Sequence, residues 1–141
     1  MQLIMGKMLF KRSKIKVCVC LECDRDTAKM GTREAEGRRF FRKVKAMARR
    51  DFPTMDVRGT ACTGGCSCRT VEEENASFSI ALMGEGRFGY VLRRMNPDNM
   101  AVVAAFLRAY QAAKNGLLTP EQDGIATALR EHIATRVPVV K

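Results

Sequence analysis

The sequence predicts an α/β protein in which a β-α-β unit is followed by a β-β-α unit and one further C-terminal helix. Two kinds of pattern support this fold class. Short alternating runs rich in β-branched residues indicate strands, and apolar residues at helical spacing indicate helices. The 141 residues are enough for one domain with a core of modest size. We expect that domain at residues 14–141, after a basic lead-in at residues 1–13.

The first part of the chain carries the pattern of the β-α-β unit. Residues 15–21 alternate and predict a strand, and residues 55–60 predict a second short strand. Residues 34–50, between them, predict a helix. The apolar face of this helix consists of Phe40, Val44 and Met47. A helical crossover joins parallel strands, so we expect the two strands to pair in parallel with the helix on one face.

The second part of the chain predicts a hairpin and two helices. Residues 78–83 and 88–92 are expected to be strands joined by a glycine-rich turn. Asn96-Pro97-Asp98 predicts a helix with Asn as its N-cap and Pro at its first position. Thr119-Pro120 predicts the start of the last helix. The apolar face of that helix is expected to consist of Ile125, Ala128, Leu129, His132 and Ile133. The complete order of elements is the thioredoxin-like order.

The positive charge is concentrated in the first third of the chain. The net charge is +10, and residues 1–50 hold fifteen of the 25 Lys and Arg residues but only five of the 15 acidic residues. The polar surface of the predicted helix at 34–50 carries Arg38, Arg39, Arg42, Lys43, Lys45, Arg49 and Arg50. Such a surface attracts phosphates, nucleic acid, anionic lipid or an acidic protein, although many basic helix faces are only solvated. The absence of Trp argues against single-stranded nucleic acid as the partner.

The six cysteines form two clusters, each at the end of a predicted strand. The first cluster is Cys18, Cys20 and Cys23, and the second is Cys62, Cys66 and Cys68. The carboxyl ends of neighbouring parallel strands meet at one edge of a sheet, where open α/β sheets commonly bind ligands. We therefore expect the two clusters to converge on one site, and we expect that site to bind a metal.

Four chemistries use thiols placed in this way. Disulfides need an oxidising compartment, and the start of the chain is not typical of a signal peptide. Structural zinc prefers four thiolates, commonly as two Cys-x-x-Cys pairs, of which this sequence has one. An iron–sulfur cluster also takes four thiolates but accepts more varied spacings, and Gly64 and Gly65 suit its close backbone approach. A redox-active dithiol of Cys20 and Cys23 is the fourth, although the intervening Glu22 would raise the pKa of these thiols.

These motifs resemble the thioredoxin-like 2Fe–2S ferredoxins. The shared features are a first strand ending in Cys20-x-x-Cys23, a basic crossover helix, and Cys62-x-Gly64-x-Cys66 before a hairpin and a helix. The nearest branch is a group of small predicted metal-binding proteins, often encoded near cobalamin-biosynthesis genes, and the resemblance covers about residues 14–140. It implies a 2Fe–2S cluster bound by Cys20, Cys23, Cys62 and Cys66. Cys18 and Cys68 are expected as alternate or additional ligands, which leaves a 4Fe–4S cluster or zinc open.

The function expected from these features is one-electron transfer by a small ferredoxin-like protein, not catalysis by an enzyme. The basic helix is expected to dock an acidic redox partner protein. The alternative is a metal-binding accessory or chaperone protein for zinc, iron or cobalt, related to tetrapyrrole or cobalamin metabolism, in which surplus thiols pass the metal on. No run of residues is long and apolar enough to span a membrane, so we expect a cytoplasmic protein. The sequence leaves a homodimer open.

Overall fold

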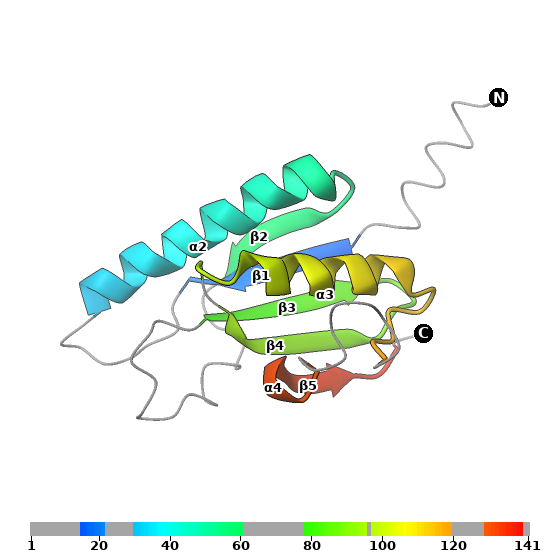
Figure 1. Ribbon diagram of the computed structural model, residues 1–141. Coiled ribbons are helices and arrows are strands. Elements are labelled where there is room, and N and C mark those ends of the chain that lie inside the picture. Colours follow the sequence, from blue (N-terminus) through cyan, green and yellow to red (C-terminus); the bar gives the residue numbers. More distant parts are fainter. Residues whose placement is uncertain (1–14, 22–29, 61–77, 96, 120–128, 140–141) are drawn as a thin grey trace.

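A computed structural model describes residues 15–21, 30–60, 78–95, 97–119 and 129–139 of the chain (Figure 1). These residues form a mixed α/β fold around one five-stranded sheet. The elements, in chain order, are β1 (Ile15–Cys20), α2 (Met30–Asp51), β2 (Asp56–Thr60), β3 (Phe78–Gly84), β4 (Gly89–Met95), α3 (Met100–Ala112), α4 (Leu129–His132) and β5 (Ile133–Val137). None of the helices in these residues is both long and apolar enough to cross a membrane.

The sheet has the strand order β2-β1-β3-β4-β5. β1 pairs in parallel with β2, from Lys16 opposite Asp56 to Cys20 opposite Thr60. The other neighbours are antiparallel: β1 with β3, β3 with β4, and β4 with β5. The parallel pairing expected from the helical crossover is therefore confirmed, and so is the hairpin of β3 and β4.

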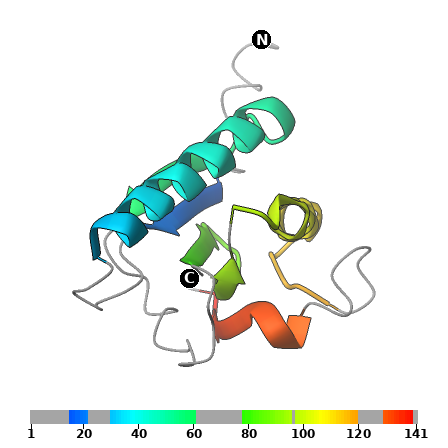
Figure 2. The same ribbon diagram turned by 60° about the vertical axis from the view of Figure 1, so that its left-hand side comes forward.

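The helices α2 and α3 lie together on one face of the sheet (Figures 1 and 2). The core fills the space between these helices and the sheet. Phe40 of α2 stacks on Phe78 of β3 with 5.6 Å between the ring centroids, and α3 contributes the fully buried side chains of Phe106 and Tyr110. The apolar face predicted for the helix at 34–50 is buried in this core, which confirms the helical pattern.

The opposite face of the sheet carries no helix in the described part of the chain, and we call it the open face. Alternate side chains of a strand point to opposite faces. On β1, Ile15, Val17 and Val19 are buried under the helices, so Lys16 and Cys18 point to the open face. Their cross-strand neighbours extend it: Asp56 and Arg58 on β2, Ala81 and Met83 on β3, Val91 on β4, and Thr135 and Val137 on β5. This face is mainly polar on β1 and β2 and mainly apolar on β3 and β4, while β5 contributes one polar and one apolar side chain.

The prediction for the C-terminal helix is wrong at its end. Ile133 was expected on the apolar face of that helix, but α4 ends at His132 and Ile133 begins β5. β5 is rich in β-branched residues, which suit an edge strand. Two hydrogen bonds attach the end of α4 to β4: Arg93 Nε donates to the Glu131 carbonyl at 2.9 Å, and His132 Nδ1 lies 3.0 Å from the Arg93 carbonyl oxygen. The predicted start of the helix, at residues 120–128, lies outside the described residues.

The start of α3 also differs from the prediction. Asn96 was expected as the N-cap, but α3 begins at Met100, and Asn99 takes the N-cap position without a side-chain capping bond. The contact with α2 explains the later start. Lys43 Nζ donates to the Pro97 carbonyl at 3.0 Å, so Pro97 is bound to α2 and does not enter the first turn of α3.

The carboxyl end of α3 is bound to the turn between β3 and β4. Arg87 Nη1 donates to the carbonyls of Tyr110 and Ala113, each at 2.8 Å, and a helix end leaves such carbonyls without intrahelical partners. The Tyr110 hydroxyl donates to the Phe88 carbonyl. Burial raises the pKa of Tyr110 to about 12, although the nearby Arg87 charge acts in the opposite direction. The fold therefore favours the neutral phenol.

We expect this tyrosine to make the protein less stable at high pH. The folded state holds the phenol proton more tightly than the unfolded chain, whose tyrosine has the ordinary pKa of 10.0. The resulting stabilisation is complete below pH 10 and is lost as the pH rises through about 12. Tyr110→Phe should lower the free energy of unfolding at neutral pH by about 1 kcal/mol, because a hydrogen bond is lost. Urea unfolding at a series of alkaline pH values measures how the free energy of unfolding falls as the pH rises. We expect a shallower fall for the variant than for the wild type, and an identical fall would contradict this account.

Candidate metal centre

Cys20 lies at the point where two parallel strands end together. It is the last residue of β1, it is fully buried, and it pairs with Thr60, the last residue of β2. The N–H of Leu21 donates to the Thr60 carbonyl at 2.8 Å, so the pairing continues one residue beyond Cys20. The strand that ends in the first cysteine cluster and the strand that precedes the second therefore end side by side, as the sequence predicts.

Hydroxyl-bearing residues flank Cys20 on both neighbouring strands. On β2, Thr60 Oγ1 is buried and has no hydrogen-bond partner among the described residues. On β3, Ser79 is fully buried and precedes Ile80, which pairs with Val19. A buried hydroxyl that stays unpaired costs about 1–3 kcal/mol, so Thr60 Oγ1 is suited to donate to an acceptor bound at the strand ends. Thiolate and sulfide sulfurs are acceptors of this kind.

Helix α2 reaches the same strand end through Gly37. A Cβ atom at Gly37 would lie 2.6 Å from the Leu21 carbonyl oxygen and 3.2 Å from its carbonyl carbon. Only glycine lets the two backbones approach this closely. Leu21 is thus bound to β2 by its N–H and covered by α2 at its carbonyl, which fixes the end of β1 and with it the position of Cys20.

Cys18 lies on the open face, two residues before Cys20 on the same side of β1. Its thiol is partly exposed and has Arg58 and Ala81 as cross-strand neighbours. Burial raises the pKa of Cys18 above its ordinary value, and the charges of Lys16 and Arg58 only partly offset that effect. Cys18 is therefore a neutral thiol at physiological pH unless a metal takes the place of its proton.

The remaining predicted ligands lie outside the described residues. These are Cys23, Cys62, Cys66 and Cys68. In the sequence, Cys23 follows Cys20 by three positions and Cys62 follows Thr60 by two, so both come directly after the paired strand ends. Within the part of the chain that the structure describes, no three His, Cys, Asp or Glu side chains come together in a group that could hold a metal ion. The ligand set therefore stays a prediction.

The cations predicted for partner docking lie on α2, where they fall into two groups. Two lysines are used by the fold: Lys43 donates to the Pro97 carbonyl, and Lys45 Nζ lies 5.6 Å from the centroid of the Phe41 ring. The exposed members are arginines, namely Arg38, Arg39, Arg42, Arg49 and Arg50. At 3.6 residues per turn, positions 38, 42, 45 and 49 share one side of the helix. This row begins beside Gly37, directly at the strand end that holds Cys20.

Sequence reasoning missed the two hydroxyl groups. Thr60 was placed at the end of the second strand, but no role was assigned to its side chain. A signal was available, because the two strands were expected to end side by side, and their parallel pairing puts Thr60 beside Cys20. Ser79 gave no such signal, since its position depends on the register between β1 and β3.

The described residues define a mixed α/β protein with a thiol and two hydroxyl groups at the strand ends beside a basic helix. The chain belongs to the family described as "Protein of unknown function (DUF1636)", whose match covers residues 17–139. That region contains both cysteine clusters and the whole of α2. No curated protein and no solved structure matches the chain.

We expect Gly37→Ala to destabilise the fold at the candidate centre. The new methyl group would overlap the Leu21 carbonyl, and overpacking of this kind costs about 1–3 kcal/mol, against a gain of about 1 kcal/mol in helix propensity. Ala46→Gly, at an exposed position of α2, is the matched control that measures the propensity effect alone. Urea unfolding under reducing conditions should show a net loss of stability for Gly37→Ala, and a stabilised variant would contradict the close approach.

Proposed function

We propose that this protein is a small iron–sulfur protein that transfers single electrons. The observation that carries the proposal is the pairing of Cys20 with Thr60, which ends β1 and β2 side by side. Cys20 belongs to the first cysteine cluster, and the second cluster begins two residues after Thr60. The proposed ligands are Cys20, Cys23, Cys62 and Cys66, holding a 2Fe–2S cluster. We also propose that the fold is thioredoxin-like, because the first two strands are parallel, α2 forms their crossover, and a β-β-α unit follows.

The described residues fit a thiolate-bound cluster. Cys20 is a soft ligand in a fully buried position, and four such thiolates are the usual protein ligands of 2Fe–2S centres. The cluster would supply the one-electron chemistry. Thr60 would donate a hydrogen bond from its buried hydroxyl to a sulfur atom, and Gly37 and Leu21 would keep the strand end in place. These residues would set the polarity around the centre and exclude water from one side of it.

The arrangement of α2 supports an acidic redox protein as the partner. The row of cations at positions 38, 42, 45 and 49 begins next to Gly37, where the helix touches the end of β1. A partner that binds this row through carboxylates therefore approaches the strand end that holds Cys20. Electron transfer is favoured when the redox centres of the two proteins are close together. A partner bound only at the far end of α2 would not bring its centre close to Cys20.

One observation favours a second function, that of a metal-binding accessory or chaperone protein. Cys18 and Cys20 lie on the same side of β1, and Cys18 is partly exposed. A protein that hands metal to another site needs an accessible thiol beside its buried ligands. Zinc, iron or cobalt would then be cargo, and tetrapyrrole or cobalamin metabolism is the proposed context.

Anaerobic purification followed by a visible spectrum and assays of iron, acid-labile sulfide and zinc tests both functions. We expect a coloured protein with iron and sulfide in equal amounts. Cys20→Ser should lose most of the cluster, while the matched variant Cys18→Ser should keep it. Colourless protein with bound zinc would contradict electron transfer and favour the accessory function. Colourless protein without metal would contradict both.

We expect Thr60 to tune the reduction potential of the loaded protein. A hydrogen bond to a ligand sulfur stabilises the reduced, more negative state, so Thr60→Val should make the potential more negative without loss of iron. Thr60→Ser keeps the hydroxyl and should stay close to the wild type. A redox titration monitored through the visible spectrum measures the reduction potentials of the wild type and both variants. Equal potentials for valine and threonine would show that the hydroxyl does not contact the cluster.

A further inference from the structure

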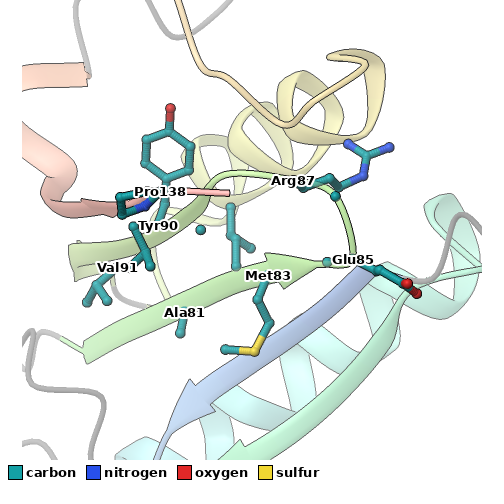
Figure 3. Close-up of a pocket in the computed structure, with 12 residues that line it drawn as sticks. Ala81, Met83, Glu85, Arg87, Tyr90, Val91 and Pro138 are labelled. Carbon is teal, nitrogen blue, oxygen red and sulfur yellow. The ribbon is translucent and has the colours of Figure 1, made fainter. Parts of the chain in front are cut away.

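The apolar half of the open face contains a hollow that the proposed function does not use. Its volume is about 420 Å³, and it lies over β3, β4 and the end of β5 (Figure 3). The floor has little side-chain bulk, because Ala81, Gly84, Gly86 and Gly89 contribute to it. The lining also includes the apolar side chains of Met83, Val91, Val137 and Pro138. Glu85 and Arg87, from the turn between β3 and β4, line its end (Figure 3). The hollow is open to one side, where its apolar walls meet the surface of the molecule.

The walls of this hollow expose large apolar side chains. Met83 is 42% exposed and Val137 is 45% exposed, and among the described residues these are the exposed large hydrophobic side chains. Both lie in the same cross-strand row, which continues to Lys16 on β1. Soluble proteins seldom expose such side chains together around a concave surface unless something binds there.

The distribution of charge indicates what can bind. The residues named above for the open face include two cations, Lys16 and Arg58, and one anion, Asp56, which forms an ion pair with Arg58 at 2.9 Å. The turn beside the hollow adds one residue of each sign, Arg87 and Glu85. The seven cations named for α2 lie in the other layer of the molecule, beyond the sheet. An anionic partner is therefore drawn to α2. The open face suits an apolar surface with little net charge, and the open face of a second copy is such a surface.

Contact through the open faces also keeps the α2 helices, the most strongly cationic parts of the two chains, far from each other. Packed sheets lie about 10 Å apart, and each helix layer adds about 10 Å, so the two α2 helices would be roughly 30 Å from each other. This distance exceeds the screening length of about 8 Å at physiological salt several-fold. A symmetric contact through α2 itself would bring the arginines of both chains within that length.

We propose that this protein forms a symmetric homodimer in which the open faces of two copies pack against each other. The contact is isologous, so each copy supplies both the protruding side chain and the hollow that receives it. Met83 of each copy enters the hollow of the other, a fit that the flexible methionine side chain favours. Val137 and Val91 complete the apolar contact, and the polar strands β1 and β2 border it.

The test is the oligomeric state in solution at concentrations from about 1 to 100 μM. Sedimentation equilibrium, with reductant and with or without chelator, separates this contact from disulfide or metal bridges. We expect a dimer that persists in both conditions. Met83→Lys combined with Val137→Lys should raise the dissociation constant at least 100-fold, because it places four unpaired cations in the contact. Both positions are exposed, so circular dichroism and thermal unfolding should show a folded variant.

The matched control reverses charge on the other layer. Arg42→Glu combined with Arg49→Glu should leave the dimer unchanged at physiological salt. A wild-type protein that stays monomeric at 100 μM would overturn the proposal. So would a dimer that survives both lysine substitutions, a dimer lost only in the α2 variant, or a dimer lost on chelation. None of these outcomes depends on whether an iron–sulfur cluster is present.

Discussion

The parallel pairing of β1 with β2 is the constraint on which the rest of the structure depends. Parallel neighbours need a crossover connection, and its helix has to cover one face of the sheet. Here that helix is α2, which buries Phe40 against Phe78 and reaches Leu21 through Gly37. The same crossover therefore places two strand ends together and brings a row of cations beside them. Among the described residues, it leaves the other face of the sheet without a helix.

Local patterns in the sequence were enough to predict the elements in which apolar residues recur at regular strand or helix spacing. β1 to β4 and α2 follow from alternation and helical spacing, and their packing confirms the inferred parallel pair. Features that depend on distant contacts were not predictable. β5 exists because β4 offers an edge, and α3 starts late because Lys43 binds Pro97. Likewise, the pairing of strand ends was predictable, whereas burial of the Thr60 hydroxyl depends on neighbours that no local pattern specifies.

On the basic helix α2, fewer cations are accessible to a partner than the sequence count suggests. The ammonium group of Lys43 donates to a backbone carbonyl, and that of Lys45 lies over an aromatic ring of the same chain. Arginines make up the exposed remainder, including Arg42 and Arg49. This division suits the proposed partner, because a planar guanidinium binds a carboxylate through two hydrogen bonds, whereas an ammonium group acts as a point charge. The surface would therefore select partners by the geometry of their acidic groups as well as by their charge.

The proposed dimer and the proposed electron-transfer site can operate together because they lie at opposite ends of β1. The hollow belongs to the row of Lys16, Met83 and Val137, near the start of β1, while Cys20 ends that strand. Four residues of strand separate the two positions by about 13 Å. A second copy on the open face would thus leave the strand end uncovered, and a partner bound along α2 would reach it from the other layer. Each copy in the dimer would then exchange electrons independently.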